Sequence, residues 1–139
     1  MISVKKIDND IMLKEAFAIR QKVFVIEQEV DPAEEYDEYE NTSTHFLAYS
    51  NDAPAGTARY RTTENGIKLE RFAVLEEMRG LGVGEALVKT VVAEVKNKAP
   101  KIYLHAQWHV IPFYAKFGFI AEGPEFEEAN IRHRKMTLG

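Results

Sequence analysis

The stretch from Leu69 to Lys98 constrains the fold of this chain more than any other part of the sequence. Residues 69–74, the end of a predicted strand, lead through the glycine-rich turn Arg79-Gly80-Leu81-Gly82-Val83-Gly84 into a long amphipathic helix. The first turn of a helix has backbone N–H groups without intrahelical partners, and the helix dipole adds partial positive charge there. Because glycine has no Cβ, a phosphate or pyrophosphate can approach these amides closely. The turn therefore predicts an anion-binding site.

The spacing of the glycines excludes two common phosphate-binding motifs. A dinucleotide fingerprint would need a third glycine where Glu85 or Leu87 stands, and a P-loop would need Lys-Ser/Thr after Gly84, where Glu85-Ala86 follows. What remains is the pattern Arg-x-x-Gly-x-Gly from Arg79 to Gly84. Taken alone, this pattern also suits a turn that joins a strand to a helix and binds nothing.

Composition limits the classes of protein to which the chain can belong. Its 139 residues are enough for one domain with a real core, so we expect a single domain over 1–139. The chain has no cysteine, which excludes disulfides, thiolate metal sites and a cysteine nucleophile. The net charge of −4 disfavours general nucleic-acid binding. No apolar run reaches the length of a membrane span and the N-terminus lacks a signal-peptide core, so we expect a cytoplasmic protein that does not bind membranes.

Hydrophobic periodicity predicts alternating strands and helices. We expect strands over residues 2–7, 44–49, 55–63, 67–74 and 102–106, and a closing edge strand over 131–138. We expect helices over residues 10–28, from 83 to a stop at Pro100, and over 112–118 with Gly118 as the stop. Asn65-Gly66 predicts a hairpin between the third and fourth strands, and the helical crossover predicts that the fifth strand runs parallel to the fourth.

Two groups of charged side chains allow more than one interpretation. Acidic residues crowd the segment 31–40, as Asp31, Glu34, Glu35, Asp37, Glu38 and Glu40. We favour a solvated loop or short helix for this run, and the alternative is a negative rim that attracts a cationic amine. Arg20 and Glu27 lie on the apolar face of the first helix, where we expect long polar side chains at the edge of the stripe rather than site residues.

Two motifs together resemble the GNAT (Gcn5-related N-acetyltransferase) superfamily. The Arg79-x-x-Gly82-x-Gly84 turn is similar to its acyl-CoA pyrophosphate loop, and Phe113-Tyr114-x-x-x-Gly118-Phe119 is similar to its C-terminal signature. The flanking segments narrow the resemblance to the ElaA/YjcF-like branch and extend it over essentially the full length. These segments are Val23-Phe24-Val25-x-Glu27-Gln28-x-Val30, the acidic run ending Asp37-Glu38-x-Glu40, Leu69-Glu70-Arg71 and Ala106-Gln107. Gln107 departs from the superfamily, in which asparagine is frequent, but it offers the same hydrogen-bonding chemistry.

This resemblance implies both a fold and an activity. The fold is α/β, with a mixed, mostly antiparallel sheet of roughly six to seven strands and helices on both faces. Its fourth and fifth strands splay apart to admit acyl-CoA. The activity is transfer of an acetyl group from acetyl-CoA to a primary amine, by direct attack in a ternary complex. The absence of cysteine agrees with direct transfer, because no thioester with the enzyme can form.

The resemblance also assigns roles to individual residues. The residues expected to bind acetyl-CoA, here a co-substrate, are Phe72, Ala73, Val74, Arg79, Gly80, Leu81, Gly82, Val83, Gly84, Gln107 and Phe113. The edge from Phe72 to Val74 would pair with the pantetheine amides, and the N–H of Val74 would polarise the thioester carbonyl as an oxyanion hole. Tyr114 would protonate the departing thiolate.

The group that takes the proton of the amine stays open. Glu70 is the first candidate, although burial would have to raise its pKa, and pairing with Arg59 or Arg71 is an equally weighted alternative. His45 titrates in the right range but is expected to be structural, and a chain of waters is a third option. No metal is predicted, because the other histidines, His105, His109 and His133, share no metal-ligand spacing on one element.

Other functions and several properties also stay open. A regulatory domain that binds acyl-CoA without turnover is the main alternative, followed by an interaction domain whose glycine turn is only structural. The acceptor could be a polyamine, an amino sugar, an amino acid, a small metabolite or an amine of a protein, and it could be cationic. A monomer and a homodimer are both compatible with the sequence.

Overall fold

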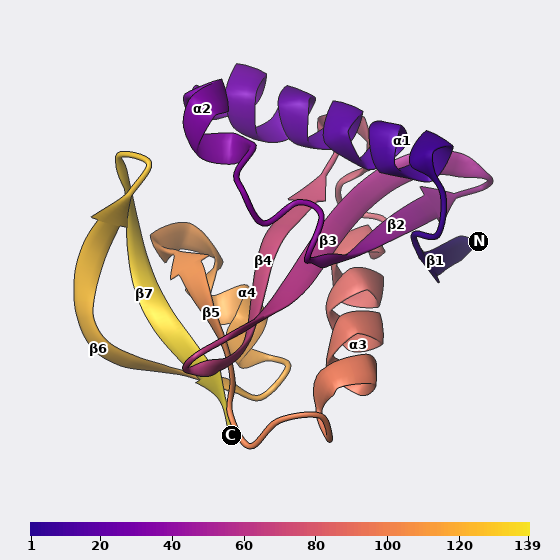
Figure 1. The fold of residues 1–139 in the computed structure, drawn as a ribbon. Helices are drawn as coiled ribbons and strands as arrows, with labels where there is room; N and C mark the ends of the chain where they lie inside the picture. Colours follow the sequence, from indigo (N-terminus) through magenta and orange to yellow (C-terminus); the bar gives the residue numbers. More distant parts are fainter.

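The chain forms one twisted, seven-stranded sheet with helices on both faces (Figure 1). The computed structural model describes all residues from 1 to 139. The strands follow the order β1-β2-β3-β4-β5-β7-β6, and all neighbours are antiparallel except β4 and β5, which are parallel. The predicted mixed, mostly antiparallel α/β fold and the parallel crossover are thereby confirmed.

The elements alternate along the chain much as the periodicity predicts. The strands are β1 (Ile2–Lys6), β2 (Thr44–Ser50), β3 (Ala53–Thr63), β4 (Gly66–Val74), β5 (Ile102–Gln107), β6 (Phe119–Glu128) and β7 (Ile131–Leu138). The α-helices are α1 (Asp10–Arg20), α2 (Pro32–Glu35), α3 (Val83–Val95) and α4 (Ile111–Ala115), and a π-helix, η1 (Gln21–Glu27), directly continues α1. Short 3₁₀ turns are η2 (Glu76–Met78) and η3 (Trp108–Val110). No helix has both the length and the apolar character needed to cross a membrane.

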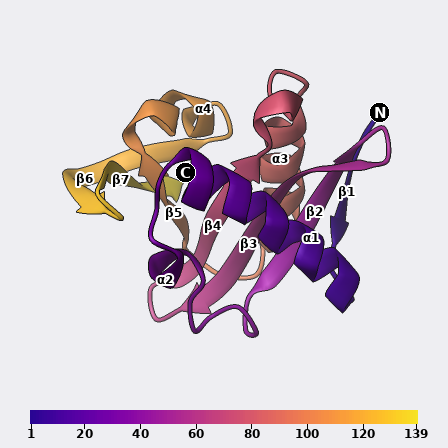
Figure 2. The same ribbon diagram turned by 90° about the horizontal axis from the view of Figure 1, so that it is seen from above.

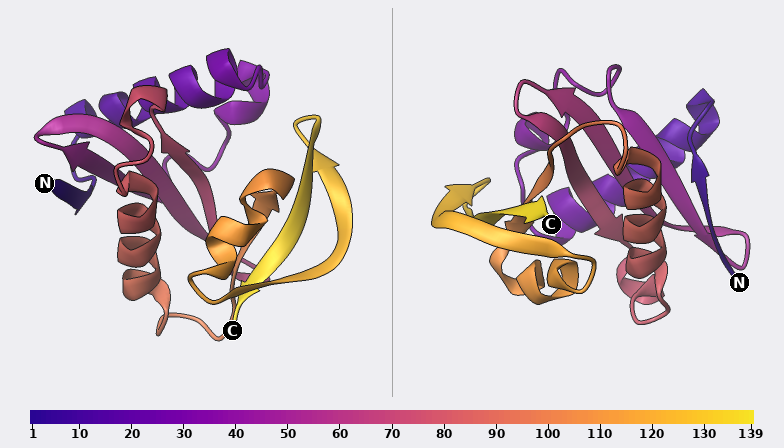
Figure 3. Two further views of the ribbon diagram at one scale, coloured as in Figure 1. Left: turned by 180° about the vertical axis from the view of Figure 1, so that it is seen from behind. Right: turned by 90° about the horizontal axis from the view of Figure 1, so that it is seen from below.

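The sheet separates two hydrophobic clusters. Figures 2 and 3 show α1 lying across one face of the N-terminal strands, with α3 and α4 on the opposite face. On the α3 side, the buried face of the helix packs against the sheet with its side chains Val83, Leu87, Val88, Val91 and Val95. On the α1 side, Ile19, Val23 and Phe24 pack against Leu47 of β2 and Ala73 of β4. Strand β4 therefore contributes to both clusters.

Strands β4 and β5 are joined over only part of their length. Their parallel pairing covers Ile67↔Ile102, Lys68↔Tyr103 and Leu69↔Leu104 and then stops. Beyond this point the two strands diverge (Figure 1), while β4 keeps its pairing with β3 up to Val74↔Gly56. The predicted splay of the fourth and fifth strands is confirmed, and it leaves one edge of β4 open from Glu70 onward.

The prediction of a closing edge strand over 131–138 is wrong in its position. Strand β7 lies inside the sheet, paired with β5 on one side and β6 on the other, so β6 is the edge. The sequence hides β6, because Gly123-Pro124 interrupts it and charged residues surround the interruption. An edge strand tolerates proline and a break in register, and the pairing indeed shifts between Glu122 and Phe126.

The predicted helix over 10–28 changes its winding halfway. From Gln21 it is a π-helix, which ends with a bond from the Gln28 N–H to the carbonyl of Val23. A π-helix has more residues per turn than the α-helix that the periodicity assumed. The side chains of its last residues therefore point in other directions than an α-helix would give them. This change of direction brings Glu27 to the glycine loop and Gln28 to β5.

Candidate active site

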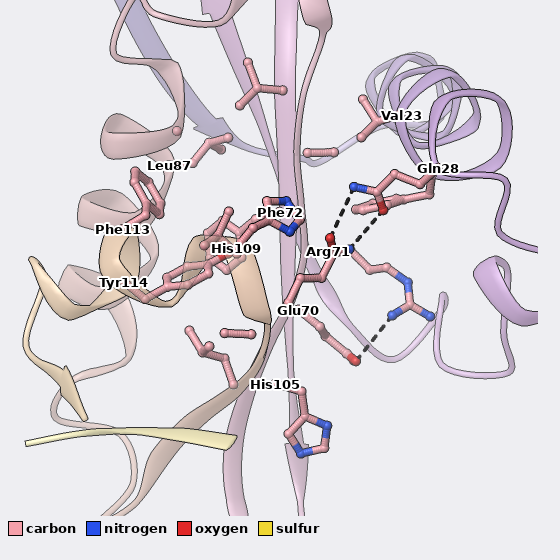
Figure 4. Close-up of a pocket in the computed structure, with 18 of the residues that line it drawn as sticks. Val23, Gln28, Glu70, Arg71, Phe72, Leu87, His105, His109, Phe113 and Tyr114 are labelled. Carbon is pink, nitrogen blue, oxygen red and sulfur yellow. Dashed lines mark hydrogen bonds and ion pairs between the residues drawn. The ribbon is translucent and has the colours of Figure 1, made fainter. Parts of the chain in front are cut away.

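The divergence of β4 and β5 opens a cavity of about 950 Å³ that reaches both faces of the sheet. The residues on the α3 and α4 side include Phe72, Val74, Leu87, Phe113 and Tyr114. The residues on the α1 side include Gln28, Glu70, Arg71, His105 and Gln107. Figure 4 shows Phe113 and Tyr114 on one side of β4, and Gln28 and Arg71 on the other. A volume of this size suits an extended ligand with a second, smaller one beside it.

The predicted glycine loop lies at one end of this cavity. Gly82 is the N-cap of α3 with φ 90°, and no side chain caps the helix. The first intrahelical bond runs from the N–H of Ala86 to the carbonyl of Gly82 at 3.1 Å, so the amides of the first turn are free to bind a ligand. All the predicted loop residues line the cavity except Leu81, whose side chain is 55% exposed. The loop therefore fits an anion such as a pyrophosphate.

Arg79 joins the glycine loop to the end of the π-helix. Its Nη1 and Nη2 donate to the two carboxylate oxygens of Glu27 at 2.6 and 2.7 Å, and its Nε donates to the carbonyl of Val74 at 3.1 Å. The hydrogen bond between them lowers the pKa of Glu27 and raises that of Arg79. Glu27 is thus part of the cavity wall, and our expectation of an edge residue outside the site is wrong.

The open edge of β4 presents backbone donors to the cavity. The N–H of Leu75 donates to the carbonyl of Ala55 in β3 at 2.9 Å. Because backbone groups alternate between the two sides of a strand, the N–H groups of Val74 and Phe72 face away from β3. The bond from Arg79 to the Val74 carbonyl agrees with this direction. Phe72, Ala73 and Val74, the residues predicted to pair with the pantetheine, all line the cavity.

Tyr114 lies beside this edge on α4. It is 8% exposed and makes edge-on contacts with Phe72, Phe113 and Phe119 at 5.7, 5.2 and 6.2 Å between ring centroids. Burial raises the pKa of its phenol, which therefore keeps its proton. A protonated hydroxyl among apolar rings is suited to donate to a group that gains negative charge.

Gln107, at the end of β5, faces the cavity and pairs with a residue that the sequence did not single out as a site residue. Its Nε2 donates to Oε1 of Gln28 at 2.9 Å, and Nε2 of Gln28 donates back at 3.3 Å. The pair joins the end of the π-helix to β5 across the cavity. Gln28 belongs to a segment that carries the family resemblance, but its orientation depends on the π turn and could not be read from the periodicity.

Glu70 lies in the cavity wall, and positively charged side chains surround its carboxylate. Its carboxylate contacts Arg59 at 3.0 Å, Arg61 at 2.5 Å, Lys68 at 3.5 Å and Arg71 at 3.8 Å. Burial alone would raise the pKa of Glu70, but these cations lower it. The raised pKa that a general base would need is therefore absent. Pairing with Arg59 and Arg71, the alternative to a base, is present.

The histidines occupy two different regions. His45 is 7% exposed, lies outside the cavity, and places Nε2 2.8 Å from the carbonyl oxygen of Glu40, while burial lowers its pKa. His105 and His133 line the α1 side of the cavity, with Glu128 between them at 3.5 and 3.7 Å. No three His, Asp or Glu side chains gather closely enough to hold a metal ion.

The acidic run is divided between solvent and a buried ion-pair network. Asp31, Glu34 and Glu38 are exposed. The other three carboxylates pair with two arginines that are at most 1% exposed: Arg20 with Glu35 at 2.6 Å and Glu40 at 2.8 Å, and Arg59 with Asp37 at 2.7 Å and Glu40 at 2.8 Å. The predicted short helix is present as α2, but the prediction that the run is solvated is wrong for Glu35, Asp37 and Glu40. The prediction of Arg20 at the edge of a helix stripe is also wrong. The sequence did contain a signal for this network: Arg20 and Arg59 lie among apolar residues, and the acidic segment 31–40 could supply their partners.

Comparisons with known proteins agree with this geometry. The acetyltransferase (GNAT) domain family matches residues 10–139. An uncharacterised N-acetyltransferase of Bacillus subtilis, YjcF, is 40% identical over 130 residues, which cover 92% of this chain and 93% of that protein. The crystal structure of Escherichia coli ElaA superposes with a TM-score of 0.86 at 29% identity and full coverage of both chains. A GNAT family acetyltransferase from Elizabethkingia anophelis, solved with acetyl-CoA bound, shares the fold, with a TM-score of 0.74, 18% identity and 99% and 97% coverage.

Proposed function

Because the chain belongs to the GNAT acetyltransferase family, we propose that it transfers an acetyl group from acetyl-CoA to a primary amine. The observation that carries this proposal is the cavity between β4 and β5, which joins the glycine loop, the open β4 edge and Tyr114 to the α1 side of the sheet. An extended thioester and an amine could then meet from opposite faces. That arrangement favours direct transfer, in which the reactants are held together before they react.

In the proposed complex, the chain holds acetyl-CoA at three places. The amides of Val83 and Gly84 at the start of α3 bind the pyrophosphate, and the open edge from Phe72 to Val74 pairs with the pantetheine. The side chain of Gln107 gives up its hydrogen bonds to Gln28 and binds the ligand from the β5 side. The structure solved with acetyl-CoA in a protein of the same fold supports acetyl-CoA as the donor.

The chemical step needs one donor for oxygen and one for sulfur. As the amine nitrogen attacks the thioester carbon, the C–N bond forms and the C–S bond breaks. The N–H of Val74 stabilises the oxygen, a contribution typically worth about 10²–10³ in rate. Tyr114 gives its proton to the departing sulfur. An amine that arrives as a cation first loses one proton to solvent. The proton that its nitrogen loses on forming the amide passes to water and from there restores the phenol, so protons balance over the cycle.

We assign no side chain as the base. The four cations around Glu70 lower its pKa and so make it a weak base, and His45 lies outside the cavity. The third option, loss of the amine proton to water, is the one that remains. Glu34 and Glu128, which line the α1 side of the cavity and are exposed, favour an amine that approaches as a cation. We place this activity in the cytoplasm and leave the oligomeric state open.

The test is release of CoA thiol from acetyl-CoA in the presence of a panel of amines: diamines, amino sugars, amino acids and a lysine-containing peptide. The chain has no cysteine, so a thiol reagent sees only the released CoA. We expect release that depends on at least one amine. Binding of CoA without release under any condition would contradict transfer and favour a regulatory acyl-CoA-binding domain.

A further inference from the structure

Strand β4 contains an irregularity centred on Arg71. Its register with β3 passes from Arg59↔Glu70 to Thr57↔Ala73, so β4 has one residue more than β3 over this interval. Arg71 has φ 61°, in the left-handed region. The other non-glycine residues with positive φ lie in turns or just after the π-helix, as Glu29, Asn51, Asp52, Ala129 and Asn130. A side chain with a Cβ disfavours this conformation, so something must hold it.

The extra residue of β4 at Arg71 forms a β-bulge, and this bulge determines which side chains of β4 face Tyr114. Before it, Leu69 packs in the cluster on the α3 side. Strict alternation would then turn Ala73 to the same side and Phe72 to the other. Instead Ala73 packs in the α1-side cluster and Phe72 contacts Tyr114 at 5.7 Å. The extra residue thereby places Phe72 and Val74, with their N–H groups, on the open edge of the cavity.

The side chain of Arg71 is bound to the segment that follows the start of α2. Nη2 donates to the carbonyls of Glu34 and Glu35, both at 3.3 Å, and to the carboxylate of Asp37 at 3.2 Å. Nε donates to the Glu35 carbonyl at 3.4 Å and lies 3.3 Å from its carboxylate. Glu35 and Asp37 are themselves fixed by the buried arginines of the network described above.

We propose that Arg71 is a positioning residue: its bonds to residues 34–37 hold the β4 bulge and so aim the Phe72 and Val74 amides at the thioester. This inference rests on the proposed function for the identity of the ligand. The donors of Arg71 are directed to α2 and to neighbouring carboxylates, so the side chain acts through the backbone and does not bind the acceptor. The ion-pair network then serves as the support of the oxyanion hole.

The first test needs no acceptor. In ¹⁵N-labelled protein, the amide proton shifts of Phe72 and Val74 are compared between the CoA and acetyl-CoA complexes, which differ only in the acetyl group. We expect a difference in the wild type and its loss in Arg71→Ala and Arg71→Gly. The shifts of Gly82 and Gly84 on binding CoA should be the same in all variants. Equal shifts of Phe72 and Val74 in the two wild-type complexes would overturn the proposal.

The glycine variant guards against loss of the fold. Glycine adopts positive φ freely, so Arg71→Gly keeps the backbone geometry accessible and removes only the side-chain bonds. Arg61→Ala is the matched control, because Arg61 also pairs with Glu70 but lies on β3, outside the cavity. A wild-type shift pattern in Arg71→Gly would show that the side chain does not hold the bulge.

The second test uses the amine that gives the fastest CoA release. Displacement of one oxyanion donor should lower kcat about 10–100-fold in Arg71→Gly, with little change in KM for acetyl-CoA, and leave Arg61→Ala unchanged. An unchanged kcat in Arg71→Gly would overturn the proposal. Absence of turnover in the wild type would instead count against the proposed function, while the shift comparison would still decide the role of Arg71.

Discussion

Among single residues, surroundings decide what each ionisable side chain of the cavity can do. Tyr114 is surrounded by aromatic rings, and burial raises the pKa of its phenol above the ordinary value of 10.0. Glu70 is also buried, yet neighbouring cations lower its pKa. The phenol therefore stays protonated and the carboxylate stays ionised over the same pH range. One is suited to donate a proton, and the other to bind cations.

This difference gives a prediction for Tyr114→Phe. The substitution keeps the ring and removes the proton donor, so kcat should fall by about 10²–10⁴ while the affinity for CoA is retained. Because the phenol pKa is raised, its deprotonation should cause no loss of activity in the wild type up to about pH 10. Tyr103→Phe is the matched control, since Tyr103 is buried in β5 outside the cavity and bonds to Thr63. Steady-state kinetics and calorimetry measure both quantities, and an unchanged kcat with chemistry limiting would remove Tyr114 from the mechanism.

Sequence motifs could identify cavity residues whose placement depends on the nearby chain. The glycines of the loop and Tyr114 are of this kind, because a turn into a helix and a short helix with a glycine stop are local structures. The charge state of Glu70 depends on Arg59, its partner across β3 and β4, and on Arg61. Pairing with Arg59 or Arg71 could be anticipated as one option, but the balance between burial and cations could not.

At the level of secondary-structure elements, the start of α3 and the end of the π-helix meet at one end of the cavity, joined by Arg79 and Glu27. The helix start was predictable because its glycines are local signals, and Gly82 adopts positive φ as the N-cap. The π-helix and strand β6 were not, since the first has no signature in a 3.6-residue period and the second is polar and interrupted by proline. The resulting contacts of Glu27 and Gln28 were missed for the same reason.

The loop can be tested with two alanine substitutions at similar backbone strain. Gly82 has φ 90° and Gly123, in the exposed part of β6, has φ 76° with open space around it. Each Gly→Ala change should lower the free energy of unfolding by about 1 kcal/mol. Gly82→Ala alone should weaken CoA binding about tenfold, roughly the value of one hydrogen bond to a charged group. Equal CoA affinities for the two variants, measured by calorimetry, would count against the loop as the pyrophosphate site.

Across the whole molecule, the buried ion-pair network joins α1, the 31–40 segment and strands β3 and β4. Burial alone would raise the pKa values of Asp37, Glu40 and Glu70, but the cations around them lower these values, that of Asp37 to about 2. Glu35 is the exception, since burial raises its pKa. Carboxylates on one short segment thus bind arginines from distant elements. Opposite charges in the sequence suggest that such pairs form, but the partner of each carboxylate depends on the fold.

These shifts predict how stability depends on pH. The three lowered carboxylates stay ionised in the folded state at pH values at which the unfolded chain takes up protons. Their stabilisation is complete above about pH 5 and is lost as the pH falls toward 2. Glu35, whose pKa is raised, has the opposite effect on stability, but it is one carboxylate against three. Urea unfolding between pH 7 and 3 should show a falling free energy of unfolding, and a flat profile would contradict the network's role.

The same experiment has a matched pair of variants. Arg59→Met leaves buried carboxylates without their cation, so it should cost about 3–5 kcal/mol at neutral pH and reduce the pH dependence. Arg132→Met removes an arginine whose pair with Glu125 is more than half exposed, and it should change the free energy of unfolding little. Similar decreases in the free energy of unfolding in both variants would show that burial does not determine how much an ion pair contributes to stability.

Transfer of an acetyl group to an amine in the cavity between β4 and β5 can be tested by following the acetyl group itself. Acetyl-CoA labelled with ¹³C in the acetyl group is incubated with the protein and the amine panel, and the products are identified by mass spectrometry. We expect the label to appear in an N-acetylated amine in proportion to the CoA released, and Tyr114→Phe to form this product more slowly. Recovery of the label only as acetate, on the protein, or in unchanged acetyl-CoA would contradict transfer to an amine.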